Sequence, residues 1–116
     1  MWLHRQLQLL TLGGGGCSLP LFLGTALGAQ LAQVIVEASP DVCAAARACF
    51  GVAEAEAAGN LQLMLGRAEQ CLEGSSRDAD VVIIDLEDEG RAPPLPLCTD
   101  LQRKMNEVGW SALVQV

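Results

Sequence analysis

The sequence predicts a single α/β domain in which helices cover both faces of a mainly parallel sheet of about five strands. Short apolar runs with strand character alternate with longer runs of helical periodicity, as in successive strand–helix–strand units. Hydrophobic residues make up 51% of the chain and aromatic residues only 3%, so the core consists mainly of aliphatic side chains, as in buried parallel strands. A length of 116 residues suits one domain, residues 1–116, without disulfide or metal staples.

The first strand–helix unit contains a run of four glycines. Residues 8–12 are predicted as the first strand and residues 18–27 as the first helix. Ser18 is the expected N-cap, and Pro20 is tolerated because it falls in the first helical turn. The glycines that begin at Gly13 therefore form the turn between a strand and a helix.

The second unit repeats this pattern. Residues 33–37 are predicted as the second strand, Pro40 opens a helix, and Gly51 ends it. Residues 52–59 form a further helix or a linker, and residues 61–65 are predicted as the third strand. The apolar residues that recur at helical spacing after Pro40 are Val42, Ala45, Ala46, Cys49 and Phe50.

The last third of the chain holds the most strand-like segment, residues 80–85, which is β-branched, apolar on both faces and closed by a carboxylate. Three prolines predict a loop at residues 87–96, and the fifth strand is expected at residues 111–116. The other expected elements are a short helix at residues 68–72, a polar loop at residues 74–78 and a helix at residues 99–108.

Charge and cysteine content exclude several classes of function. The formal charge is −7 and Lys104 is the single lysine, so the basic stripe that binds a nucleic-acid backbone is missing. The five cysteines contain no Cys-x-x-Cys pair, which favours reduced thiols, no metal and a cytoplasmic location. The apolar run at residues 19–31 is too short to cross a membrane. A signal peptide is the alternative for the N-terminus, but Gln6 and Gln8 interrupt its apolar run.

A candidate binding crevice lies at the carboxyl ends of the predicted strands, where ligands of open α/β sheets bind at the point of strand-order reversal. The glycines let the backbone approach a ligand closely, and the helix that follows offers free N–H groups to it. Glu37 at the end of the second strand can accept two hydrogen bonds from ribose hydroxyls. Glu37 follows Gly13 by 24 residues, near the spacing of about 20 expected for that pairing. The alternatives are a flexible glycine loop and a solvated strand end.

Two common phosphate-binding motifs do not fit the turn. The dinucleotide motif G-x-G-x-x-G requires glycine where Ser18 or Leu19 stands, which disfavours NAD. A P-loop is excluded because no G-K-[ST] follows the glycines. Cys17 lies at a helix N-terminus, where a thiolate is stabilised, although close packing is the other role open to it.

Two carboxylates, Asp85 and Asp88, follow the fourth strand, where a substrate would meet a bound nucleotide. Such a pair can bind an amine or accept its proton. The alternative is an acidic, solvated loop, since Glu87 and Glu89 lie beside them.

Three segments resemble the spermidine-synthase-like family of class I S-adenosylmethionine-dependent methyltransferases. This family includes polyamine aminopropyltransferases and the carboxyl-terminal domain of the dual methyltransferase that acts on translation elongation factor 1A. The resemblance covers residues 9–116 and implies a Rossmann-like class I methyltransferase fold, a three-layer sandwich of which this chain holds the N-terminal half. The three segments are LGGGGCSLPLFL at residues 12–23, VIVEASP at residues 34–40 and DVVIIDLED at residues 80–88.

S-adenosylmethionine is the cofactor that the resemblance implies. Gly13 and Gly15 would then line the methionyl end of the cofactor, Glu37 would hold the ribose, and Asp85 would face the sulfonium or the substrate. The truncated sheet leaves the fifth strand as an exposed apolar edge, which a second copy or a partner chain is expected to cover.

The chain departs from the family pattern at three positions. Cys17 replaces the third turn glycine and is expected to place a side chain where the backbone approaches the cofactor. Ser39 replaces the second acid after the second strand. Arg67 replaces the acid near the adenine, and an unpaired adenine amine would cost about 1–3 kcal/mol of binding free energy.

The leading functional hypothesis is methyl transfer to a protein amine. A second enzyme hypothesis is aminopropyl transfer to a polyamine, in which Asp85 and Asp88 bind the cationic acceptor. A third hypothesis, from another class, is a catalytically silent interaction module with a degenerate nucleotide site, which the three departures favour.

Overall fold

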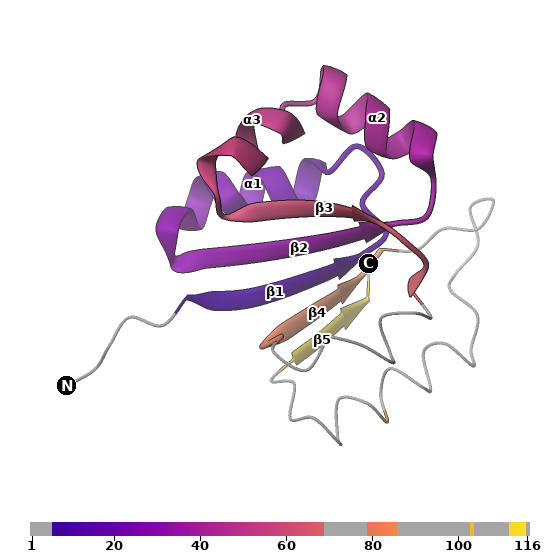
Figure 1. Ribbon diagram of the computed structural model, residues 1–116. Coiled ribbons are helices and arrows are strands. Elements are labelled where there is room, and N and C mark those ends of the chain that lie inside the picture. Colours follow the sequence, from indigo (N-terminus) through magenta and orange to yellow (C-terminus); the bar gives the residue numbers. More distant parts are fainter. Residues whose placement is uncertain (1–5, 69–78, 86–102, 104–111, 116) are drawn as a thin grey trace.

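The strands form one parallel sheet in the order β3-β2-β1-β4-β5 (Figure 1). This computed structural model describes residues 6–68, 79–85, 103 and 112–115. The central strand β1 pairs with β2 on one side and with β4 on the other, so the strand order reverses at β1. The strands are β1 (Leu7–Leu12), β2 (Leu31–Glu37), β3 (Leu61–Leu65), β4 (Val81–Ile84) and β5 (Ala112–Gln115).

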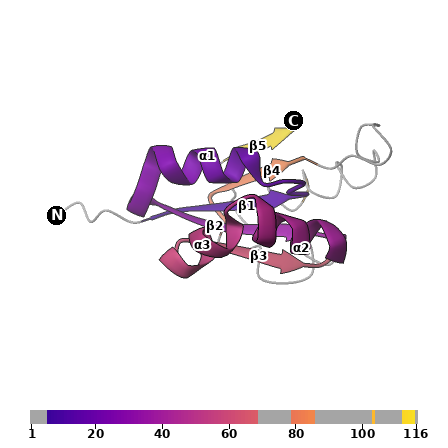
Figure 2. The same ribbon diagram turned by 90° about the horizontal axis from the view of Figure 1, so that it is seen from above.

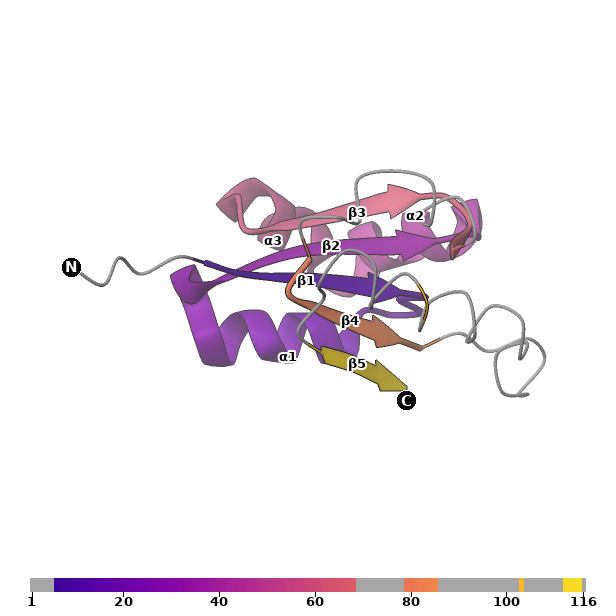
Figure 3. The same ribbon diagram turned by 90° about the horizontal axis from the view of Figure 1, so that it is seen from below.

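Three α-helices lie on the same face of the sheet. Seen from above they stand in front of the strands, and seen from below the strands stand in front of them (Figures 2 and 3). The crossovers from β1 to β2 and from β2 to β3 step in the same direction across the sheet, so right-handed connections place their helices on one side. The helices are α1 (Ser18–Leu27), the 3₁₀ turn η1 (Gly28–Gln30), α2 (Pro40–Cys49) and α3 (Val52–Ala58).

Both faces of the central strands are buried. On the helical face, Leu9, Leu31 and Ile83 pack against α1, while a second cluster around Ile35 packs against α2 and α3. On the opposite face, Leu12, Val82 and Ile84 have exposed fractions of 1% or less. Burial on both faces explains why these strands consist of nearly continuous apolar residues.

The sequence predicted most of these elements closely. The bounds of α1 and β3 agree with the prediction, β2 begins two residues earlier than expected, and residues 52–58 are helix and not linker. Ala68 and Arg103 are helical, as expected. The predicted loops at residues 74–78 and 87–96 and most of the helices at residues 68–72 and 99–108 lie outside the described residues.

Two local predictions were wrong. Ser18 is the first residue of α1 and not its N-cap; the chain enters the helix through Cys17, whose φ of 63° and ψ of 26° are left-handed. On α2, Cys43 and Ala46 are the buried residues, whereas Cys49 and the C-cap residue Phe50 are exposed. The apolar spacing identified the helix and included Ala46, but packing on the sheet turns the buried face toward Cys43 and away from Cys49.

An ion pair on the helical side covers part of the β3 edge. The Arg47 guanidinium donates to both carboxylate oxygens of Glu56, at 2.8 and 3.1 Å. Arg47 also donates to the Leu63 carbonyl at 2.7 Å, and the Leu63 N–H donates to Glu56 at 3.1 Å. These two side chains therefore satisfy backbone groups of an edge strand, as a neighbouring strand would do.

We expect Glu56→Gln to destabilise the fold at neutral pH and to destabilise it less as the pH falls. The hydrogen bonds from Arg47, and the one from the Leu63 N–H, lower the pKa of the Glu56 carboxyl. Because the pKa of Glu56 is lower in the folded state, its ionised carboxylate stabilises the fold fully above the unfolded-state pKa of about 4.3. This stabilisation is lost as the pH falls through the folded-state pKa. Urea unfolding at pH 7 and pH 3 measures this, with Glu54→Gln on the exposed side of α3 as the control. A difference as large at pH 3 as at pH 7 would contradict an ionic contribution.

Candidate functional site

Backbone hydrogen bonds gather the segments that follow four strands at one edge of the sheet. The Gly13 N–H donates to the Val36 carbonyl at 2.7 Å, and the Asp85 N–H donates to the Leu12 carbonyl at 2.8 Å. The Gly66 N–H donates to the Glu37 carbonyl at 2.9 Å. The glycine turn therefore lies between the ends of β2 and β4, at the point where the strand order reverses. This is where open α/β sheets bind their ligands.

The glycine turn packs tightly against the sheet. A Cβ atom on Gly14 would lie 2.7 Å from Cγ2 of Ile35 and 3.1 Å from Sγ of Cys17, which is closer than side chains approach. Gly15 has a φ of +54°, and the space around it is open. A side chain at position 14 would therefore lack space, whereas at position 15 the left-handed backbone favours glycine. The sequence pattern marked the turn as glycine-rich but gave no means of distinguishing these two requirements.

The carboxylate of Glu37 binds the glycine turn directly. Its Oε1 accepts hydrogen bonds from the N–H groups of Gly14 and Gly15, each at 3.2 Å. Its Oε2 accepts one from the Ser39 N–H at 2.9 Å. One side chain at the end of β2 therefore joins the turn after β1 to the segment before α2. Two N–H groups of the turn thus face Glu37 in this structure.

Cys17 does not enter the crevice. Its side chain is fully buried, in one cluster with Ile35 and Cys43, and its Sγ lies 3.9 Å from the Gly15 carbonyl oxygen. Burial, and then the neighbouring Cys43, raise the pKa of the Cys17 thiol, so a reactive thiolate at the helix N-terminus is not supported. The expectation of a side chain facing the cofactor was wrong, because the left-handed backbone at Cys17 directs its Cβ into the core.

The remaining predicted residues lie as follows. Asp85 is half-buried and follows β4 beside the glycine turn, and Arg67 is exposed, two residues after β3. Asp88 lies outside the described residues. Ser39 is the N-cap of α2, where its hydroxyl oxygen accepts from the Val42 N–H at 3.2 Å. A serine followed by a proline at the first helical position is a recognisable signal for this cap.

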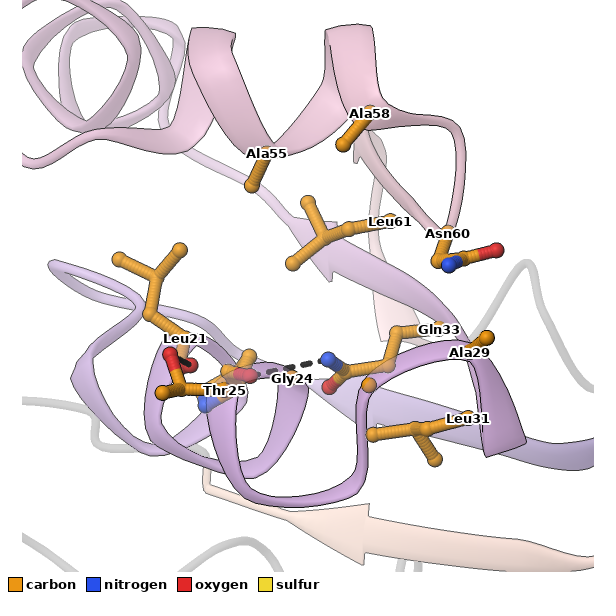
Figure 4. Close-up of a pocket in the computed structure, with 12 residues that line it drawn as sticks. Leu21, Gly24, Thr25, Ala29, Leu31, Gln33, Ala55, Ala58, Asn60 and Leu61 are labelled. Carbon is orange, nitrogen blue, oxygen red and sulfur yellow. Dashed lines mark hydrogen bonds between the residues drawn. The ribbon is translucent and has the colours of Figure 1, made fainter.

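A separate pocket of about 350 Å³ lies between α1 and α3, at the amino ends of the strands (Figure 4). Leu21, Ala55 and Leu61 contribute apolar side chains to it. The Gln33 amide at its side donates to the Pro20 carbonyl at 2.9 Å, while Gln33 Oε1 is buried and has no hydrogen-bond partner among the described residues. Because that oxygen is inaccessible, the pocket lacks an anchoring group there. It lies at the opposite end of the strands from the glycine turn.

Two kinds of feature are missing from the residues that the structure describes. No helix in these ranges has the length and hydropathy needed to cross a bilayer. No cluster of three or more His, Cys, Asp or Glu side chains in the same ranges is arranged to hold a metal ion.

The arrangement defines a Rossmann-like fold of the class I methyltransferase type, as the resemblance implied, and similar solved structures support this. Helices α1, α2 and α3 cover one face of the sheet, and the helical layer expected on the other face stays a prediction. Human methyltransferase-like protein 13, in complex with SAH, is 23% identical with a TM-score of 0.62; the match covers 93% of this chain and 50% of that one. A mutant of MtNAS in complex with S-adenosylmethionine is 20% identical with a TM-score of 0.61, and the match covers 86% of this chain and 35% of that one. A spermidine synthase with the transition-state analogue AdoDATO is 17% identical with a TM-score of 0.54, and the match covers 70% of this chain and 28% of that one.

The chain therefore spans between 28% and 50% of the length of these three structures. Neither a protein-family model nor a curated protein sequence matches it. At these identities the similarity establishes the fold alone.

Proposed function

We propose that this chain binds S-adenosylmethionine at the edge formed by the glycine turn, Glu37 and Asp85, as part of a methyltransferase that acts on a protein amine. The observation that carries the proposal is the Glu37 carboxylate, which lies beside the turn where the strand order reverses. Carboxylates at this place in nucleotide-binding α/β folds hold ribose hydroxyls. Adenosyl ligands in two of the similar structures support the choice of ligand.

The residues present fit such a ligand. The crevice side of the turn is open at Gly15, where no atom lies within 4 Å of the position a Cβ would take. Cys17, which would have obstructed the backbone, is buried in the core. Glu37 lies close enough to the turn for one ligand to contact both. Of the three departures from the family pattern, Cys17 therefore leaves the crevice free. The other two are Ser39, which serves as a helix cap, and Arg67.

Little chemistry is required of the protein in methyl transfer, because positioning lowers the barrier. The bound cofactor supplies a methyl group on a positively charged sulfur. Glu37 holds the ribose, and the glycine turn lets the backbone approach the methionyl end. Asp85 would orient the substrate amine toward the methyl group and accept the proton that the amine loses. Asp88, in the segment after β4, is proposed to share this role.

A calorimetric titration with S-adenosylmethionine tests the proposal. We expect heat of binding for the unmodified protein and an affinity about tenfold to a hundredfold lower for Glu37→Ala, since a hydrogen bond to a charged group is lost. Glu54→Ala, which removes an exposed carboxylate of α3, is the matched control and should bind like the unmodified chain. Absence of heat with the unmodified chain would contradict the proposal.

Decarboxylated S-adenosylmethionine separates the second enzyme hypothesis from the first. The similarity to spermidine synthase favours aminopropyl transfer to a polyamine as the alternative. Tighter binding of the decarboxylated form would support it. If neither compound binds, a silent interaction module is the remaining hypothesis, with a second copy or a partner chain on the edge of β5.

A cytoplasmic location and the absence of nucleic-acid and membrane partners also stay predictions.

A further inference from the structure

The strand β3 lies at one edge of the sheet, and its outer side faces away from β2 (Figure 1). On its inner side, the Asn60 carbonyl accepts from the Gln33 N–H at 2.8 Å, and the Gly66 N–H donates to the end of β2 at 2.9 Å. Successive residues of a strand turn their backbone groups to alternate sides. The odd-numbered residues of Leu61–Leu65 therefore point their N–H and carbonyl groups outward.

Two side chains from the helical layer occupy the middle of this outer edge. Arg47 of α2 donates to the Leu63 carbonyl at 2.7 Å, and Glu56 of α3 accepts from the Leu63 N–H at 3.1 Å. The two side chains are joined to each other, with Nε of Arg47 and Oε1 of Glu56 2.8 Å apart. A strand added at this edge needs both backbone groups of Leu63, so it cannot pair there while the ion pair holds them.

The strand itself offers no protection against pairing. Its sequence, LQLML, carries no charge, and Met64 and Leu65 are 44% and 58% exposed. Natural sheets discourage pairing at an edge by placing charged side chains on the edge strand. At β3 the charges in the middle of the edge come instead from Arg47 and Glu56, on the neighbouring helices.

We propose that the Arg47–Glu56 pair closes the β3 edge to strand addition, and that this edge pairs antiparallel with β3 of a second copy when the pair is removed. Leu63 can lie opposite Leu63 of the second copy, with both hydrogen bonds exchanged between them, while Leu61 lies opposite Leu65. This arrangement is two-fold symmetric, so the same surface serves both copies. The uncharged strand also brings no like charges together, although the chain carries a charge of −7.

The double variant Arg47→Ala/Glu56→Ala tests the proposal, because it frees both backbone groups of Leu63 and leaves the net charge unchanged. By sedimentation velocity over a concentration series, we expect it to self-associate at least about tenfold more tightly than the unmodified chain. Glu54→Ala, on the exposed side of α3, is the control and should sediment like the unmodified chain. A double variant that is folded by circular dichroism and associates no more tightly would overturn the proposal. If it does not fold, Glu56→Gln, which keeps the shape of the side chain, takes its place with the same two outcomes.

Cross-linking shows whether the association uses the β3 edge in the proposed register. With Leu63 on the two-fold axis, Gln62 lies opposite Met64 of the second copy, at a Cα separation of about 4.5 Å that suits a disulfide. Gln62→Cys and Met64→Cys are introduced separately into the double variant, oxidised alone and as a mixture, and the linked peptides are identified by mass spectrometry. We expect the linkage between these two positions in the mixture, and little linkage in either preparation alone, because identical positions lie about 7–8 Å apart on the diagonal. Equal linkage in all three samples, or a dimer without linkage at β3, would overturn the proposal.

Discussion

Replacing Gly14 with alanine is expected to lower the free energy of unfolding by about 1–3 kcal/mol, as overpacking of a core does. The added Cβ would lie 2.7 Å from Cγ2 of Ile35 and 3.1 Å from Sγ of Cys17. Ile35 is fully buried and branched at its Cβ, so it has few other rotamers to move into. The turn would have to shift away from the sheet. Urea unfolding followed by circular dichroism measures the loss.

Gly16→Ala is the matched control in the same turn. A Cβ on Gly16 would meet only ring atoms of Phe50, at 3.9 Å, which is ordinary contact. The substitution also reduces the conformational freedom of the unfolded chain, so stability should stay unchanged or rise by up to about 1 kcal/mol. Equal unfolding midpoints for Gly14→Ala and Gly16→Ala would show that the turn does not pack as described.

Cys49 is expected to react with a thiol reagent at least about a hundredfold faster than Cys17 and Cys43 in the folded protein, because the buried thiols react only after local opening. Cys49 is exposed, whereas the other two are buried. Burial is also the main cause that raises the pKa of both buried thiols, so a smaller fraction of each is thiolate at pH 8. Quantitative mass spectrometry of peptides after timed alkylation measures the three rates separately.

Denaturation provides the control for this prediction. In urea above the unfolding midpoint, the three cysteines should react at similar rates, because the difference comes from the fold and not from the neighbouring sequence. Fast labelling of Cys17 in the folded protein would contradict its place in the core. It would also restore the hypothesis of a reactive thiol at the N-terminus of α1.

The buried sulfur changes how the turn is understood. A left-handed φ at a residue other than glycine costs roughly 1–2 kcal/mol, which explains why glycine would suit position 17. At Cys17 the buried side chain offsets part of that cost through its contacts in the cluster around Ile35. The replacement of the family's third turn glycine by Cys17 therefore changes the interior of the domain. It leaves unchanged the face of the turn that would meet a ligand.

The sequence by itself determined the order and type of the elements and the edge of the sheet at which the site lies. Alternating strand-like and helical runs identified the five strands and the helices α1 and α2, because hydrophobic periodicity is a local property of the chain. The 3₁₀ turn η1 was not predicted, and residues 52–59 were left open between helix and linker. The glycines after β1 and the carboxylate that ends β2 located the crevice, since parallel strands bring their carboxyl ends to one edge.

Only the tertiary structure decided which atoms face the crevice. The close approach of Gly14 to Ile35 and the hydrogen bonds from the Gly14 and Gly15 N–H groups to Glu37 are contacts between residues far apart in the chain, at separations of 23 and 22 positions for the two hydrogen bonds. The direction of the Cys17 side chain likewise depends on how the turn packs on the sheet. The same holds for the buried face of α2, which packing on the sheet selects. Local patterns contain no information about such distances, because side chains meet across strands and turns only after the chain has folded.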